Sequence, residues 1–514
     1  MKALKGLLIY IGIVLAIMFG ICILLFSLMY FIPSFRLFGV GVVHASEVRN
    51  NETIVLAEYS SFDNIELSVN SKKVNISVVP TTESENISYS LSLSTFGISF
   101  DITEYRIIRA VDVEGKTLKV NLSVTEPNGW ISNTGSYMKV YVPASYQYNL
   151  LSKIESGNIY LGDKDAILQL KNLTVNSGSG DVYVTNLAKD GVLNLQSLNL
   201  TTNSGGVDFS EIGVLNVENK VLINAKNGEY YFNVLNADMD IRGTGVRITA
   251  NTINCLTSGF TFMSENGYFK VDNLNTMGGA ETTIVTENCN VIINKLTGNA
   301  GIITTYGNIE IAKAYNDLIL ESTHGKIVVA EVLGDVRATS QYGDITCNYY
   351  KNGTFINRNG EMFLMSKGEY QAGFVTKIET EDGNFSLDNN INQVYVKIKG
   401  DAHGDVTFWN IKKGLDIDTT YQHTIYTGND GSCEVWLPPR PGEGVYFRFT
   451  AKGNISGEIS GLTPKYEGDT VQSSDDPQYY PKEEFKDMWY TCCSFWFEGT
   501  IEFESIDPMK VSPF

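Results

Sequence analysis

The stretch STHGKIVVAEVLGDVRATSQYGDITCNYYKNG, residues 322–353, contains the same short phrase twice. The phrase is an aromatic residue or histidine, then glycine, any residue, an apolar residue, any residue and a second apolar residue. It begins at His324 and at Tyr342, and a further copy begins at Tyr306. The corresponding glycines are Gly307, Gly325 and Gly343, so the phrase recurs every 18 residues. A fixed period of this length predicts a repeat architecture.

The same phrase recurs along most of the chain with looser spacing. In its other copies the first residue is Ser, Asn, Asp or His, and these copies begin at Ser156, Ser179, Asn227, Asn266, Asn359, Asp382, His403 and Asp430. Apolar and polar residues alternate on both sides of each glycine, as they do in strands with one buried face. We expect the glycines to supply the positive φ of a sharp turn between these strands.

Two architectures fit short alternating strands joined by glycine turns. In a parallel β-solenoid, or β-helix, successive turns stack and like residues form inward columns. The repeat predicts two such columns, which are Ile309, Ile327 and Ile345, and Ile311, Val329 and Cys347. A meander of antiparallel hairpins is the alternative, because Asn-Gly is also a hairpin signal. Hairpins do not require matching inward positions, so the sequence favours an all-β fold built as a parallel β-solenoid.

The first residues predict a membrane anchor. Residues 6–32 carry no charge and are mostly apolar, and roughly 20 such residues span a bilayer. A cleaved signal peptide is the alternative, but its candidate cleavage site at Val43-His44-Ala45 lies too far beyond the apolar run. Lys2 and Lys5 predict a cytoplasmic N-terminus. We therefore expect a single-pass protein of the cell membrane whose large domain is extracytoplasmic.

The sequence predicts six segments. Residues 1–5 form a cytoplasmic N-terminus, 6–33 a transmembrane helix and 34–47 a juxtamembrane linker. Residues 48–150 form an N-terminal β-rich cap, 151–436 the parallel β-solenoid repeats, and 437–514 a C-terminal β cap and tail. In the last segment we expect Met488–Phe497 to lay a strand over the open end of the solenoid. The sequence leaves undecided whether a second solenoid module begins near residue 435.

Two motifs carry a resemblance to a known family. Val140-Tyr-Val-Pro143 is followed by Ser179-Gly-Asp-Val-Tyr-Val184. In this order of motifs the chain resembles the bacterial membrane-anchored putative-adhesin family, a domain of unknown function with repeated Ser-Gly-Asp-Val-x-Val turns, over about residues 50–460. The resemblance implies an extracytoplasmic β-solenoid behind an N-terminal membrane helix. The family has no accepted catalytic residues, so the resemblance assigns none here.

Motifs for catalysis, cofactors and metals are absent from the sequence. It lacks Gly-x-Ser-x-Gly, a Walker loop and a dinucleotide fingerprint, and its four histidines and seven cysteines show no metal-ligand or disulfide spacing. The aspartates after the turn glycines suit turns better than a calcium site. We expect Cys347 and Cys433 to face inward and Cys289 to lie at a turn. With a net charge of −19, nucleic acid is not an expected partner.

Tyr306, His324 and Tyr342 form the one candidate site. A period of 18 places them on the surface of three successive turns, with rings about 5 Å apart, which is within range of aromatic stacking. This strip either binds a ligand, such as the apolar faces of sugar rings, or only rigidifies the turns.

The function that these features predict is non-enzymatic. We expect a membrane-anchored cell-surface adhesin or envelope scaffold, which contacts the bilayer through its helix and a surface glycan or protein through its solenoid. The alternatives are an envelope-stress regulatory membrane protein and a glycan-active β-helix enzyme. Solenoid shape does not separate these classes, because function depends on sites and not on folds.

Overall fold

The protein is nearly all β-structure, with one long N-terminal helix. The computed structural model describes the backbone of residues 2–32, 36–37, 40–59, 62–101, 103–133, 135–163, 168–185, 191–366, 374–390 and 393–408, and beyond these only the strands up to residue 503. Side chains are described no further than Val406. The chain divides into two compact units, residues 1–235 and 236–514.

The described residues of the first unit form the helix, one turn of 3-10 helix (Leu56–Glu58) and sixteen strands. The elements are α1 (Lys2–Phe31), β1 (Gly41–Ile54), β2 (Asn64–Ser71), β3 (Asn75–Thr81), β4 (Ile87–Ser99), β5 (Arg106–Glu114), β6 (Thr117–Thr125), β7 (Gly129–Ser132), β8 (Tyr137–Pro143), β9 (Tyr148–Ile154), β10 (Ile159–Leu161), β11 (Leu170–Ser177), β12 (Val182–Val184), β13 (Val192–Leu195), β14 (Ser197–Thr202), β15 (Val207–Val217) and β16 (Val221–Asn236).

Strand pairing in the first unit is mixed. β4 pairs antiparallel with β1, β7 and β8, and β5 pairs antiparallel with β6. In contrast, β2 pairs in parallel with β6 and β9, and β3 pairs in parallel with β8 and β10. Parallel stacking therefore begins inside the expected cap of residues 48–150, and β1 begins at Gly41, inside the expected linker. Residue 150 marks the start of the glycine rhythm in the sequence, while parallel pairing starts earlier.

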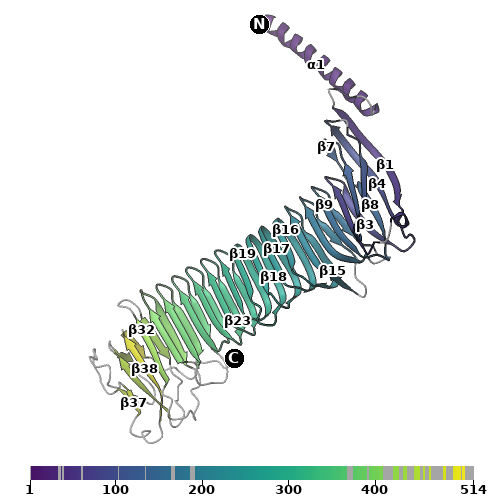
Figure 1. Cartoon of the computed structure of the whole chain (residues 1–514). Coiled ribbons are helices and arrows are strands. Elements are labelled where there is room, and N and C mark those ends of the chain that lie inside the picture. The colour runs from purple at the N-terminus through teal and green to yellow at the C-terminus, as the bar shows by residue number, and fades with distance from the viewer. Residues whose placement is uncertain are drawn as a thin grey trace. The chain divides into compact units, whose positions relative to one another are not determined.

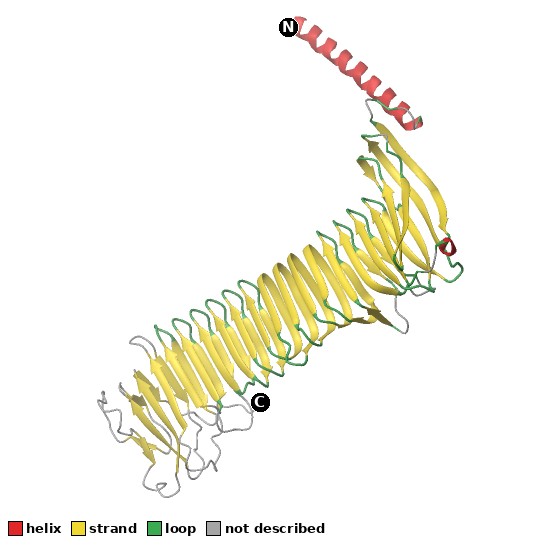
Figure 2. Cartoon of the chain, in the orientation of Figure 1, coloured by secondary structure: helices red, strands yellow, loops and turns green. Residues whose placement is uncertain are grey.

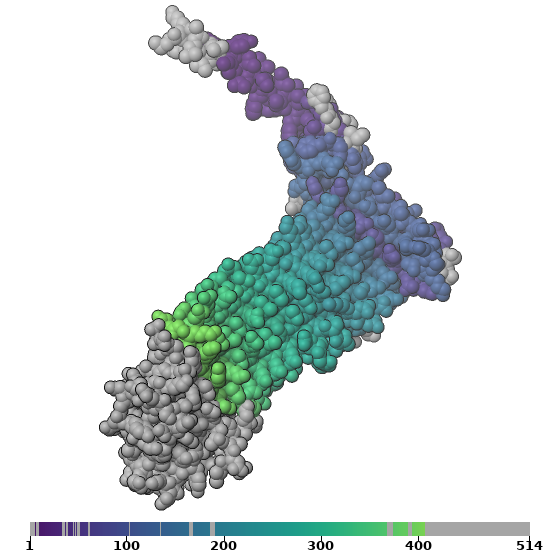
Figure 3. Space-filling model, turned by 60° about the vertical axis from the view of Figure 1, so that its left-hand side comes forward, coloured from purple at the N-terminus to yellow at the C-terminus, as the bar shows by residue number. Residues whose placement is uncertain are grey.

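The helix α1 is the membrane-span candidate of the described residues. Tyr10–Phe31 is long and apolar enough to cross a bilayer, and its most apolar stretch is not buried against the protein, although Met29 near its end is buried. In its unit, α1 projects away from the strands and meets them at its C-terminal end (Figure 3). The expected helix at residues 6–33 corresponds to this element.

The elements described in the second unit are all strands. They are β17 (Met239–Cys255), β18 (Phe260–Thr276), β19 (Thr282–Thr297), β20 (Ala300–Thr304), β21 (Ile309–Ala314), β22 (Leu318–Ser322), β23 (Ile327–Val332), β24 (Asp335–Ser340), β25 (Ile345–Asn348), β26 (Asn352–Asn357), β27 (Met362–Met365), β28 (Val375–Thr380), β29 (Phe385–Asn390), β30 (Gln393–Ile398), β31 (His403–Phe408), β32 (Tyr421–Thr427), β33 (Ser432–Trp436), β34 (Val445–Ala451), β35 (Ile455–Gly457), β36 (Leu462–Pro464), β37 (Tyr479–Pro481), β38 (Tyr490–Glu498) and β39 (Thr500–Phe503).

Successive turns of the second unit stack in parallel (Figure 1). β17, β18 and β19 pair along nearly their whole lengths, and from β20 to β31 each strand pairs with the second strand after it. The pairing joins Ile309 to Ile327 and Ile327 to Ile345, an offset of 18 residues. The predicted parallel β-solenoid is confirmed, and the antiparallel hairpin alternative is wrong for the described repeats.

The predicted inward columns are buried. Ile309, Ile327 and Ile345 are fully shielded from solvent, as is Val329, and the neighbouring residue Val328 is 38% exposed. Burying one such side chain is worth about 1.5–3 kcal/mol, and each apolar residue in a column also packs on the same position of the turns above and below. The core of the solenoid is therefore a set of apolar columns that run perpendicular to the strands.

The turn glycines are required for a reason that the sequence did not reveal. We expected a positive φ, but Gly307, Gly325 and Gly343 do not have one. A Cβ built on Gly343 would lie 2.1 Å from the carbonyl oxygen of Gly325, and one on Gly325 would lie 1.9 Å from the carbonyl oxygen of Gly307. At these corners each turn passes so close to the previous backbone that only a residue without a side chain fits.

The cysteines follow the register of the strands. Cys347 is buried in the inward column as predicted. The prediction that Cys289 lies at a turn is wrong. Cys289 lies inside β19, which runs straight through the corner position, and its side chain is fully buried. Its sulfur donates to the carbonyl oxygen of Ser264 at 3.7 Å, and burial raises the pKa of the Cys289 thiol to about 11. The side chain of Cys433 lies outside the described residues.

The aromatic segment near the C-terminus is part of the parallel sheet. β38 pairs in parallel with β32 and with β34, so it has a neighbour on each side. It forms an interior rung and not the covering strand that we expected for Met488–Phe497. The proposed start of a second module near residue 435 falls mostly outside the described residues.

Replacing Ile327 by Asp tests the inward columns. We expect Ile327→Asp to destabilise the chain by about 3–5 kcal/mol, because it places an unpaired charge between Ile309 and Ile345. Val328→Asn is the matched control, and it should cost no more than about 1 kcal/mol because its side chain reaches solvent and adds no charge beside Glu310. The midpoint of thermal unfolding, followed by circular dichroism, measures both. Equal losses would contradict the register.

Replacing Gly343 by Ala tests the close approach at the corner. We expect Gly343→Ala to cost about 1–3 kcal/mol, since the added methyl group forces two turns apart. Gly301→Ala is the control, because a Cβ there meets no atom within 4 Å and its φ is not positive. The midpoint of thermal unfolding of the Gly301→Ala chain should be equal to or higher than that of the natural chain. A Gly343→Ala chain as stable as Gly301→Ala would show that the corner has room for a side chain.

Candidate functional site

The corners after β20, β22 and β24 carry the candidate residues, and the corners follow one another along one edge of the stack (Figure 2). Tyr306 and His324 stack with ring centroids 4.7 Å apart and planes 18° apart. His324 and Tyr342 stack at 4.9 Å and 21°. Tyr306 is 54% exposed and Tyr342 is 48% exposed. The structure thus brings together all three residues that the 18-residue period aligned, in an exposed column that we call the corner column.

Stacking determines which ring surfaces stay available. His324 has a tyrosine against each of its faces, so only its edge reaches solvent. Tyr306 and Tyr342 each use one face against His324, and each is about half exposed. The column therefore leaves two ring faces that are not stacked on another ring, one at each end, and we call these the open faces. It also presents the ring edges and two phenol hydroxyls. The column is therefore not the continuous strip of three accessible rings that the sequence predicts.

Exposed amide side chains continue the same corner position beyond the rings. Asn288 precedes Tyr306 by one turn, and Asn359 follows Tyr342 by one turn, where its backbone N–H donates to the carbonyl oxygen of Gln341 at 2.9 Å. The amide of Asn288 also donates to the side-chain oxygen of Asn266 at 3.1 Å. Each open ring face is thus next in line to a side chain that both donates and accepts hydrogen bonds.

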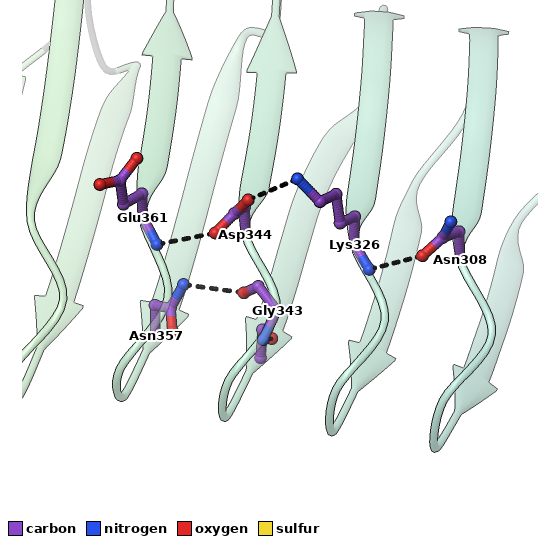
Figure 4. Close-up of polar contacts among 7 residues, drawn as sticks. Asn308, Lys326, Gly343, Asp344, Asn357 and Glu361 are labelled. Carbon is purple, nitrogen blue, oxygen red and sulfur yellow. Dashed lines mark hydrogen bonds and ion pairs between the residues drawn. The ribbon is translucent and has the colours of Figure 1, made fainter.

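A polar ladder follows the glycines of the same corners (Figure 4). The side-chain oxygen of Asn308 accepts the backbone N–H of Lys326 at 3.0 Å, and that of Asp344 accepts the backbone N–H of Glu361 at 3.2 Å. Lys326 Nζ lies 2.8 Å from Asp344 Oδ2. The hydrogen bond to Lys326 lowers the pKa of the Asp344 carboxyl. These side chains satisfy backbone groups of the next turn and so hold the corner rigid.

A second polar column, which was not predicted from the sequence, lies inside the corner. Thr304, Ser340 and Asn357 are buried, and each accepts a hydrogen bond from the backbone N–H of the glycine three residues later, at 2.9–3.0 Å. The Asn357 amide also donates to the Gly343 carbonyl oxygen at 3.1 Å, which links two turns (Figure 4). The signal was a Ser, Thr or Asn at an inward position before each glycine, where the alternation favours an apolar residue.

The aspartates that follow the turn glycines bond to residues of the neighbouring turns. Asp344 binds Lys326 and the next backbone, and Asp181 accepts the backbone N–H of Gly206 at 2.9 Å. Among the described residues, no group of three or more His, Cys, Asp or Glu side chains is placed to hold a metal ion. What these corners present to a ligand is ring faces, hydroxyls and amides, which bind non-covalently.

Comparison with known proteins identifies one domain. Residues 62–252 match the model of a family described as Toastrack DUF4097, which confirms for that stretch the resemblance seen in the motifs at Val140 and Ser179. No curated protein matches the chain. Among solved structures, a protein from Clostridium sporogenes ATCC 15579, described as a putative cell adhesion protein, is similar at 13% identity with a TM-score of 0.24, over 44% of this chain and 99% of that one.

Proposed function

Because residues 62–252 form a Toastrack domain, a solenoid-forming module with no accepted catalytic residues, we propose that the chain is a cell-surface protein that binds its ligand without converting it. The helix α1 anchors it in the membrane as a single span. The strands then lie on the extracytoplasmic side, and the solenoid serves as an adhesin or as a scaffold of the envelope. The apolar length of Tyr10–Phe31 supports the anchor.

The corner column is the proposed ligand site, and the carrying observation is the pair of open tyrosine faces at its ends. The stack and the ladders of the corner hold these rings in place, so little conformational entropy is lost when a ligand binds. A sugar ring has an apolar face that can pack on a tyrosine face, and hydroxyls that can bond to the amides of Asn288 and Asn359. A surface glycan is therefore the ligand class that the corner fits.

The bonds that the Asp344 carboxylate makes within the corner also favour a binding function over a catalytic one. A glycan-active enzyme needs two carboxyl groups on either side of the bond to be cleaved. At these corners the Asp344 carboxylate is paired with Lys326 and bonded to the backbone of Glu361. A carboxylate held in this way stabilises the turn and is poorly suited to donate a proton.

Removing both open faces tests the site. We expect the Tyr306→Ser/Tyr342→Ser chain to bind glycans about 5- to 150-fold more weakly than the natural chain, since two ring contacts of about 0.5–1.5 kcal/mol each are lost. The full chain in lipid nanodiscs is applied to a glycan array, and its thermal unfolding is followed in parallel. Tyr395→Ser, a change at another exposed tyrosine of the same unit, is the control and should bind normally.

The alternatives give different results. An unchanged affinity with a lower midpoint of unfolding would mean that the column only rigidifies the turns. Release of new reducing ends from a bound glycan would indicate an enzyme. If the natural chain binds no glycan on the array, the proposed ligand class is wrong.

A further inference from the structure

Three exposed aromatic side chains gather where β4 ends beside β7. Phe96, Phe100 and Trp130 are all open to solvent, and Trp130 is 76% exposed. Large aromatic residues are among the side chains that gain most from leaving water, so a tryptophan this open, next to two exposed phenylalanines, calls for a partner. We call these three residues the aromatic tip.

Strand pairing places two residues of the tip on a single face. Trp130 pairs with Ile98 across the antiparallel β4–β7 ladder, and cross-strand partners share a face of the sheet. Phe96 lies two residues before Ile98 in β4, so it points to that same face, whereas Phe100 lies one residue beyond the end of β4. The rings of Phe100 and Trp130 meet edge to face, with centroids 5.2 Å apart.

The tip is continuous with the end of the apolar helix. The ring of Tyr30, in the last turn of α1, lies 6.3 Å from the ring of Phe96 and 6.0 Å from that of His44. Tyr10–Phe31 has 22 residues, or about 33 Å of helix, close to the roughly 30 Å of a bilayer's hydrocarbon core. A spanning α1 therefore has Tyr30 and Phe31 at the membrane interface.

Topology brings the same end of the sheet to that interface. The paired residues Gly41, Ser99 and Gly129 form one row, where β1 and β7 begin and β4 ends. Phe100 and Trp130 directly follow two of these residues. Two cations border the row, since Lys73 Nζ donates to the carbonyl oxygen of Gly129 at 3.3 Å and Arg36 donates to that of Asp101.

We propose that the aromatic tip inserts into the interfacial layer of the bilayer, as a second membrane contact beside α1. This inference rests on the proposed anchoring by α1. Tryptophan and other aromatic rings favour the boundary between headgroups and acyl chains, and shallow burial of an apolar surface there binds proteins to membranes. Lys73 and Arg36 at the rim suit lipid phosphates. The contact fixes the first strands against the membrane, so that the helix is not a free tether.

Fluorescence quenching by lipid tests the proposal. The full chain is placed in nanodiscs that contain lipids brominated near the headgroup end of the acyl chains. The chain has five tryptophans, so the quenching due to Trp130 is taken as the difference between the natural chain and Trp130→Phe. We expect quenching in the natural chain and its loss in Trp130→Phe, whose replacement stays apolar and aromatic.

A matched control places a tryptophan elsewhere. In the Trp130→Phe background, Val55→Trp adds one at an exposed position just past the end of β1 opposite to Gly41, and we expect no recovery of quenching. Resistance to alkaline carbonate extraction from membranes separately reports whether α1 spans. A chain that resists extraction but shows equal quenching with and without Trp130 overturns the aromatic tip alone. A chain that is extracted overturns the anchor of the proposed function as well.

Discussion

The structure depends on the close stacking of one backbone turn on the next. In parallel pairing each residue lies beside its equivalent in the neighbouring turn at about 4.8 Å, and at the corners the contact is so close that Gly325 and Gly343 have no room for a Cβ. Whatever side chain a position carries is thereby repeated as a column. Isoleucine columns fill the core, hydroxyl and amide columns close the corners, and the rings of Tyr306, His324 and Tyr342 stack outside.

This constraint explains what could be predicted from the sequence. The 18-residue offset aligned Ile309 with Ile327 and Ile345, and alternation placed Val328 outside, because column position and face depend only on spacing. The role of the glycines could not be predicted in the same way, since the clash at Gly343 is with a turn 18 residues earlier and not with its own neighbours. Cys289 was misplaced for a related reason, because β19 continues straight where other turns bend.

The candidate site shows the same division. The period predicts that three rings meet at the surface, and it does so from their positions alone. The side-chain angles decide that the rings lie face to face, which leaves open faces only on Tyr306 and Tyr342. The aromatic tip could not be predicted at all, since Phe96 and Trp130 come together through antiparallel pairing that carries no repeat. The two proposed sites, the aromatic tip and the corner column, give the protein one contact with the membrane and another with a ligand on its solenoid.

The most direct test of the parallel stack is a pair of competing disulfides. Val328 pairs with Thr346 on the next turn, so Val328→Cys/Thr346→Cys should place two sulfurs within bridging reach and form an intramolecular disulfide under mild oxidation, identified by mass spectrometry. In an antiparallel hairpin about Gly325, Val328 would instead face Glu321. A disulfide in Glu321→Cys/Val328→Cys, with none between positions 328 and 346, would contradict the solenoid and every column derived from it.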